Sequence, residues 1–325
     1  MTPCLRRASL VAILAMLTVA SATAQEQARR IGLLTIHESQ CGNLPLREGL
    51  RELGYTEGKH YVIDCRHAGG DNARLASASA ELVRAKPDVI VTMFHVGAEA
   101  MQKTTRNIPV VMIASGDPVA AGLIASLARP GGNITGVTYF ASELYAKRLE
   151  FLKAVVPNLK RVGLLIQTSG SKRMTRSYLD ASQRAARVLG LELVTLEADN
   201  AAEITAAYEK AKRSGIQAIH VLGYTIFSEE ASLIASLASL NEIPTIHFLN
   251  SFPSMGGLMG YGPDYLALQR RTATYVDKIL RGANPATLPV EIPTRLVLAI
   301  NTGAARDLGL QVPQALLLRA DKVIE

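Results

Sequence analysis

Short polar and aromatic side chains follow the strand-like runs of this sequence, at the positions where parallel sheets bind ligands. Hydroxyl and amide groups, together with the unpaired N–H groups at a helix start, suit a carboxylate. Aromatic rings can stack on a planar group. Each residue is also an ordinary choice for an α/β loop, so the set carries more weight than any single member. The candidate ligand-binding residues are His37, Ser39, Phe94, His95, Ser115, Asp117, Tyr139, Thr168, Ser169, Tyr224 and Asn250.

Motifs that would indicate catalysis are missing from the sequence. It contains no G-x-S-x-G elbow, no Walker loop, no H-E-x-x-H and no C-x-x-C. The first strand-to-helix turn lacks G-x-G-x-x-G, which disfavours a dinucleotide. The six histidines are dispersed, and no two are four residues apart, as helical metal ligands would be. We therefore expect no catalytic residue, no metal and no cofactor.

The elements that must position the candidate residues alternate between strand-like and helical runs. Apolar runs rich in β-branched residues lack polar alternation, which predicts strands buried on both faces. In the first half the expected strands are 29–36, 60–66, 88–94, 108–115 and 133–139, and the expected helices are 43–53, 72–86, 96–106 and 119–128. Such alternation is typical of a parallel sheet covered by helices on both faces.

The same rhythm restarts in the second half of the chain. The expected helices there are 142–156, 173–190, 203–215 and 228–241, and the expected strands are 161–167, 191–197, 216–223 and 243–249. The last part differs. It combines a helix over 264–282, an extended proline-rich segment over 283–294, a strand over 295–301 and a short helix over 302–310.

Two doubly wound units in succession predict an α/β fold of two Rossmann-like lobes with parallel sheets. The break at Arg129-Pro130-Gly131-Gly132 indicates where the chain leaves the first lobe. The late helix and the proline-rich segment imply two further crossings, and three crossings make a hinge. The expected division places residues 25–138 and 263–288 in lobe I, and residues 139–262 and 289–325 in lobe II.

The first 24 residues predict a signal peptide. Arg6 and Arg7 precede an apolar run over residues 8–20, and Ala22-Thr23-Ala24 fits a cleavage site near Ala24. An uncleaved N-terminal anchor is the alternative. The formal net charge is +7, but the basic residues are scattered instead of forming a stripe, which disfavours nucleic-acid binding. The predicted signal peptide indicates an exported protein, and a mature chain of about 300 residues predicts two domains.

Two cysteines, Cys41 and Cys65, remain after the predicted cleavage. An even pair in an oxidising compartment favours a disulfide. Both cysteines are expected near the ends of neighbouring strands, which would bring them within bonding distance. Two free buried thiols are the alternative.

One long string of residues resembles a known family. The segment SGDPVAAGLIASLARPGGNITGVT (115–138) resembles ABC-transporter substrate-binding proteins of the tryptophan/tyrosine type, which belong to the periplasmic binding protein type I class. Further matches are REGLRELGYTEGKHYVID (47–64) and AKRLEFLKAVVPNLKRVGLL (146–165), and the match extends through the last quarter of the chain. The resemblance implies three hinge strands, capture of a small-molecule ligand by closure, and delivery to an ABC permease driven by an ATPase subunit.

The resemblance leaves the ligand open. Relatives that take an α-amino acid are expected to offer an acidic residue in the loop after IHVLG (219–223), where this chain has Tyr224 and Thr225. An aromatic amino acid and a related aromatic or carboxylate compound both remain candidates. A ligand sensor for a membrane signalling partner and a secreted enzyme on the same fold are the alternative functions. The protein is expected to be a monomer.

Overall fold

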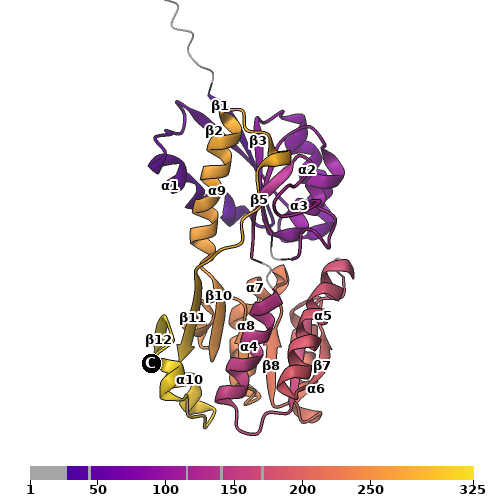
Figure 1. Cartoon of the computed structure of the whole chain (residues 1–325). Coiled ribbons are helices and arrows are strands. Elements are labelled where there is room, and N and C mark those ends of the chain that lie inside the picture. Colours follow the sequence, from indigo (N-terminus) through magenta and orange to yellow (C-terminus); the bar gives the residue numbers. More distant parts are fainter. Residues whose placement is uncertain (1–27, 43–44, 115, 140–141, 170–171) are drawn as a thin grey trace, which may run out of the picture.

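A computed structural model of the chain describes residues 28–42, 45–114, 116–139, 142–169 and 172–325 (Figure 1). Its helices and strands form two stacked lobes, each built around one sheet. Within the described ranges, no helix combines the length and the apolar character needed to cross a bilayer. The signal-peptide prediction falls on residues outside the described ranges, as does candidate Ser115.

Lobe I is a five-stranded parallel sheet in the order β2-β1-β3-β4-β5. Helices α1 and α9 pack on one face, and α2 and α3 pack on the other (Figure 1). Strands β3 and β4, inside the sheet, are buried along their whole length because helices cover both faces of the sheet. The elements of lobe I are β1 (Arg29–Thr35), α1 (Pro45–Glu52), β2 (Tyr61–His67), α2 (Leu75–Arg84), β3 (Val89–Met93), α3 (Phe94–Thr104), β4 (Val110–Ala114), β5 (Ile134–Thr138) and α9 (Tyr265–Leu280).

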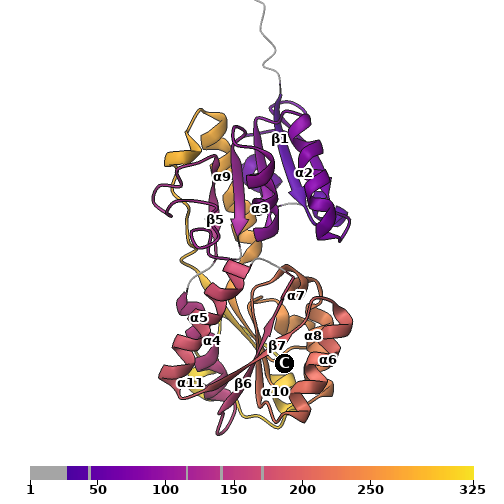
Figure 2. The same ribbon diagram turned by 90° about the vertical axis from the view of Figure 1, so that its right-hand side faces the viewer.

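Lobe II is a seven-stranded sheet in the order β12-β11-β10-β9-β8-β6-β7. Neighbouring strands are parallel except for the antiparallel pair β10 and β11. Figure 2 shows α4 and α5 on one side of this sheet and α6 and α8 on the other. Its strands are β6 (Arg161–Ile166), β7 (Glu192–Glu197), β8 (Ala218–Val221), β9 (Thr245–His247), β10 (Met259–Pro263), β11 (Leu296–Asn301) and β12 (Lys322–Ile324). Its helices are α4 (Ser142–Val155), α5 (Lys172–Leu189), α6 (Ala201–Arg213), α7 (Thr225–Glu229), α8 (Ala231–Leu240), α10 (Thr302–Asp307) and α11 (Gln314–Leu317).

Helix α9 follows a strand of lobe II but packs in lobe I. Asp264 caps its start by accepting hydrogen bonds from the amides of Leu266 and Ala267, both at 3.1 Å. The helix then lies so close to α1 that a Cβ at Gly49 would come within 2.6 Å of the Arg270 carbonyl oxygen. Only glycine at this position allows such an approach.

Three segments of chain connect the lobes. The first leaves β5, the second runs from β10 into α9, and the third runs from η4 (Pro285–Thr287) to β11. The third segment lies against β5 through two backbone hydrogen bonds. The Thr138 amide donates to the Glu291 carbonyl at 2.9 Å, and the Glu291 amide donates to the Gly136 carbonyl at 3.1 Å. Arg271 on α9 pairs with the Glu291 carboxylate at 2.9 Å. The crossings therefore form one connected hinge, as the sequence predicts.

The structure corrects two expected elements and adds two that were not expected. Residues 119–128 form successive turns, not the predicted helix, because Asp117 Oδ1 accepts from the amides of Val119 and Ala120 and Gly122 adopts a left-handed φ of +74°. The predicted helix over 228–241 is two helices, α7 and α8, which meet at Glu230. The last residues add α11 and β12, which the sequence reasoning did not predict.

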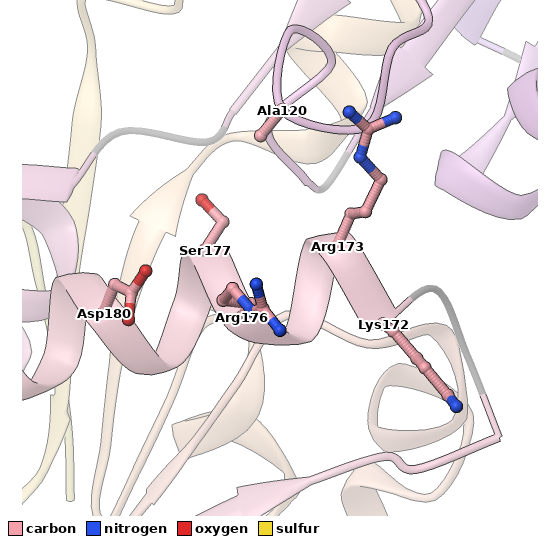
Figure 3. Close-up of a pocket in the computed structure, with 6 residues that line it drawn as sticks. All are labelled: Ala120, Lys172, Arg173, Arg176, Ser177 and Asp180. Atoms are coloured by element: carbon pink, nitrogen blue, oxygen red, sulfur yellow. The ribbon is translucent and has the colours of Figure 1, made fainter.

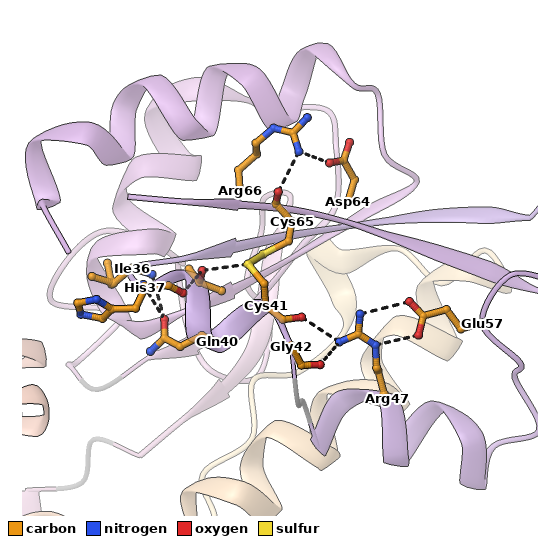
Figure 4. The surroundings of a disulfide bond; sticks show 11 residues. Ile36, His37, Gln40, Cys41, Gly42, Arg47, Glu57, Asp64, Cys65 and Arg66 are labelled. Carbon is orange, nitrogen blue, oxygen red and sulfur yellow. Dashed lines mark hydrogen bonds and ion pairs between the residues drawn. A yellow bond between two sulfur atoms is a disulfide. The ribbon is translucent and has the colours of Figure 1, made fainter. Parts of the chain in front are cut away.

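The predicted disulfide joins Cys41 to Cys65 (Figure 4). Cys41 ends the short helix η1 (Glu38–Cys41), and Cys65 lies in β2 opposite Leu33 of β1, so the Cα–Cα distance is 6.0 Å. Arg47 Nη1 donates to the Cys41 carbonyl oxygen at 2.9 Å, and Arg47 Nε lies 2.8 Å from Glu57. The bond ties the loop after β1 to the edge of the lobe I sheet.

Candidate functional site

The two lobes touch at the ends where their parallel strands finish. His37, after β1, reaches Glu229 of α7 with Nε2 2.7 Å from the Glu229 oxygen. The two groups are in contact, but their geometry does not meet that of an aligned hydrogen bond. A Cβ at Gly116 would lie 2.6 Å from the sulfur of Met174 on α5, so a second contact crosses between the lobes. The carboxyl ends of the two sheets therefore face each other, and these are the ends at which open α/β sheets bind ligands.

Aromatic rings gather at the carboxyl end of the lobe I sheet, next to the hinge. The Phe94 ring stacks on Tyr265 of α9, with centroids 5.8 Å apart and planes at 16°. Tyr139, just after β5, meets Tyr265 edge-on at 6.2 Å. Phe94 holds a φ of +63°, which a bulky residue rarely adopts and which costs about 1–3 kcal/mol. This backbone conformation turns the chain directly from β3 into α3, with the Phe94 ring against the hinge helix.

His95 follows Phe94 and is 1% exposed. Its Nε2 lies 3.4 Å from the Glu99 carboxylate one turn later, and its Nδ1 would be 3.1 Å from a Cβ at Gly116. His95 therefore sits beneath the contact between Gly116 and Met174. Asp117 caps the turn after Gly116, as described above, and Ser39 lies exposed in η1.

Lobe II contributes a column of tyrosines. The Tyr224 hydroxyl bonds Thr175 Oγ1 at 2.9 Å, and the Tyr178 hydroxyl donates to the Gly223 carbonyl at 3.0 Å. The two rings meet edge-on at 5.2 Å, and Tyr145 of α4 adjoins Tyr178 at 5.4 Å. Burial raises the pKa of Tyr224 to about 12, so its phenol remains neutral near pH 7.

The other lobe II candidates bond mainly to the chain itself. The amides of Thr168 and Ser169 both donate to Asp199 Oδ1 at 2.9 Å, and the Thr168 hydroxyl donates to Oδ2. Burial alone would raise the pKa of Asp199, but these hydrogen bonds together lower it below its ordinary value. Asn250 Nδ2 donates to the Pro263 carbonyl at 3.2 Å and so ties the loop after β9 to the hinge.

A basic pocket of about 370 Å³ opens where α5 faces the turn of lobe I (Figure 3). Ala120 comes from lobe I, and all other lining residues come from the first turns of α5. Three cationic side chains and one carboxylate line the pocket, so its net charge is positive. Its lining residues are Ala120, Lys172, Arg173, Arg176, Ser177 and Asp180.

Sequence reasoning missed Tyr265 and Arg148. Tyr265 is the first residue of a helix far along the chain, and only its return to lobe I brings it to Phe94. Arg148 is three residues after Tyr145 and four before Leu152, both buried, so it occupies the apolar stripe of α4. A charged residue at an apolar position of a predicted helix was the signal in the sequence that could have pointed to Arg148.

No group of three or more His, Cys, Asp or Glu side chains in the described part of the chain could hold a metal ion.

The family model of ABC transporter substrate binding proteins matches residues 42–324. The chain belongs to the ABC transporter substrate-binding protein family. This is a family of solute-binding proteins, not of enzymes. A Tyrosine-binding protein from Clostridioides difficile (strain R20291) is 27% identical over 264 residues, 81% of this substrate-binding protein and 75% of that relative.

Solved structures agree with this family. The ABC domain from Streptococcus pneumoniae in complex with L-Trp is similar with a TM-score of 0.84 at 27% identity, covering 91% of this chain and 100% of that one. A conserved domain protein from Vibrio cholerae gives the same values: 0.84, 27%, 91% and 100%. A leucine-binding protein from Thermotoga maritima shares the fold at 15% identity and a TM-score of 0.55, covering 80% and 78% of the two chains. The fold is that of type I periplasmic binding proteins, as predicted.

Proposed function

We propose that this substrate-binding protein captures an aromatic amino acid, or a related aromatic carboxylate, in the cleft between its lobes. The observation that carries the proposal is the set of rings at the hinge, where Phe94, Tyr265 and Tyr139 lie together. A planar ligand placed against them would gain stacking and apolar burial. The similar proteins named for tyrosine binding and solved with L-Trp support the same class of ligand.

Capture proceeds by hinge closure. In this proposal residues 25–138 and 263–288 move as lobe I, and residues 139–262 and 289–325 move as lobe II. The ligand docks on one lobe, and its contacts with the other shift an open–closed equilibrium. The contacts from His37 to Glu229 and from Gly116 to Met174 form in the closed state. Each contact joins only one pair of residues, so both can break again when the ligand leaves.

The proposed setting is the periplasm, after removal of residues 1–24. There the protein acts as a monomer that delivers its ligand to an ABC permease and its ATPase. A disulfide such as Cys41–Cys65 is suited to that oxidising compartment.

A thermal-shift screen of the mature protein, followed by calorimetry, tests the ligand class. We expect L-tryptophan, L-tyrosine, L-phenylalanine or an aromatic acid such as indole-3-acetate to raise the melting temperature, because a ligand selective for the folded state stabilises it. Leucine and arginine are the matched non-aromatic probes. Small-angle scattering should show a smaller radius of gyration with the ligand bound. Binding confined to non-aromatic probes, or chemical turnover of the ligand, would contradict the proposal.

A further inference from the structure

In the part of the chain that the structure describes, the guanidinium of Arg148 is buried inside lobe II without a carboxylate partner. Arg148 is 2% exposed. Its Nε donates to the Tyr261 carbonyl oxygen at 2.8 Å, and its guanidinium carbon lies 5.5 Å from the centre of the Tyr145 ring. Among the residues that the structure describes, no Asp or Glu oxygen comes within ion-pair distance of it. Internal residues outside the described ranges (43, 44, 115, 140, 141, 170 and 171) are not acidic, so the sequence supplies no partner there.

Other arginines of the chain show the opposite arrangement. Arg47 pairs with Glu57, Arg161 with Glu192 and Arg271 with Glu291, at 2.8 to 3.0 Å, and all three cations are partly exposed. A charge taken out of water without a counter-charge is unfavourable, and buried cations are normally paired. Burial accordingly lowers the pKa of Arg148. Lobe II therefore holds a cation whose neutralising partner is missing from the described chain.

The position of this cation points to the cleft. Helix α4 starts just after the first crossing, and Arg148 lies one turn below Tyr145, which adjoins Tyr178 of the tyrosine column. A Cβ at Gly262 would lie 3.7 Å from Arg148 Nη2. Gly262 is the second-last residue of β10, immediately before the chain crosses into lobe I. The guanidinium thus reaches the cleft end of the sheet, beside the hinge.

We propose that Arg148 is a specificity-determining residue whose charge is neutralised by the carboxylate of the bound ligand. The inference rests on the proposed function and sharpens it: the ligand class is an aromatic acid, and the corresponding amide is rejected. Within the described chain, the carbonyl of Tyr261 and the ring of Tyr145 are uncharged neighbours that do not neutralise the guanidinium. An anionic group entering the cleft completes its pairing.

Calorimetry with matched acid and amide probes tests the inference. The probes are L-tryptophan with L-tryptophanamide and L-tyrosine with L-tyrosinamide, which share the ring and the ammonium. The variant is Arg148→Met, which keeps length and apolar contacts, and Lys147→Met on the exposed side of α4 is the control. The wild type should bind the acid about 10- to 100-fold more tightly than the amide. Arg148→Met should lose most of that preference, and Lys147→Met should keep it.

The melting temperature of the ligand-free variants separates this role from a structural one. Replacing a buried, unpaired charge with an apolar side chain should leave the melting temperature unchanged or raise it. A large fall with the acid preference intact would overturn the inference. A wild type that binds amides as tightly as acids would also overturn it, whether or not any variant folds, while leaving the proposed capture of aromatic ligands standing. A wild type that binds none of these probes, and no other aromatic acid such as indole-3-acetate, would refute the proposed function itself.

Discussion

The two lobes share a winding pattern but differ in what they bury near the cleft. Strands β3 and β4 of lobe I are wholly buried, lobe I buries the imidazole of His95, and a disulfide ties its first loop to β2. Lobe II buries Arg148 and the imidazoles of His220 and His247. Buried polar and charged groups add little stability and often lower it. The comparison teaches that the aromatic rings beside the hinge gather in lobe I, whereas the buried guanidinium lies in lobe II.

The imidazoles of lobe II are held neutral by their surroundings. His247 lies between the rings of Phe248 and Phe252, at centroid distances of 4.6 and 4.8 Å. Its Nδ1 accepts from the Leu249 amide, so Nε2 carries the proton and donates to the Phe227 carbonyl, both at 3.0 Å. Burial lowers the pKa of His247 to about 3, and burial also brings the pKa of His220 well below its ordinary value.

Removing the disulfide should produce the largest change in stability and should act on lobe I. We expect the double variant Cys41→Ala/Cys65→Ala to lose about 3 kcal/mol of unfolding free energy, because the bond closes a loop with a sequence separation of 24. Urea unfolding measures this loss, with the wild type under a reductant as the matched control. If lobe I alone weakens, the transition should split into two steps. A single unshifted transition would contradict the stabilising role.

Removing the ring of Phe94 should have the largest effect on ligand affinity within lobe I. Phe94→Ala should weaken binding of an aromatic ligand about 30-fold, close to 2 kcal/mol, because stacking and apolar burial are lost. Phe94→Gly should bind equally weakly but melt at a higher temperature than the alanine variant, since glycine accepts a φ of +63° without strain. Calorimetry and thermal melting check both expectations. Val188→Ala, on the exposed side of α5, is the control.

Acid should weaken lobe II through its neutral imidazoles. Between pH 6.5 and pH 3 the unfolded chain protonates His247 while the folded chain does not, so stability falls as the pH drops. His247 alone should contribute a slope that approaches 1.4 kcal/mol for each pH unit below 6.5, and His220 adds to it. His247→Gln should therefore reduce the slope relative to the wild type and leave the part that His220 contributes. Urea unfolding at pH 7, 6 and 5 measures the slope, and an unchanged slope in the His247 variant would count against this assignment.

The contact between His37 and Glu229 should have the smallest effect, because both side chains are partly exposed. His37→Ala and Glu229→Gln should each weaken ligand binding about two- to fivefold, the value of roughly 0.5–1 kcal/mol for such a pair. The double variant should lose no more than either single one, because the two residues act together. Calorimetry of the wild type, the two single variants and the double variant gives the double-mutant cycle that tests this expectation. Additive losses would mean that the two residues act separately.

Local patterns in the sequence predict the sheets but not the details that depend on packing between distant segments. Apolar runs such as residues 108–115 locate the strands, because parallel strands are buried on both faces. The false helix over 119–128 followed alanine-rich composition and ignored the left-handed turn at Gly122. The rule that ligands bind after strands led to the prediction of Phe94 and Tyr139 as ligand-binding residues. It could not point to Tyr265, because that residue reaches these two rings through the packing of α9 on α1.

The route of α9 through the molecule limits how the protein can be dissected. A fragment that stops at residue 262 would contain every strand of lobe I but would leave Leu46 and Leu50 of α1 without the helix that shields them. A fragment limited to the second half would carry that helix with nothing to pack against. Neither half of this protein is a contiguous stretch of chain, so excised or tagged pieces should be built by joining residues near 138 directly to the start of α9 at Tyr265.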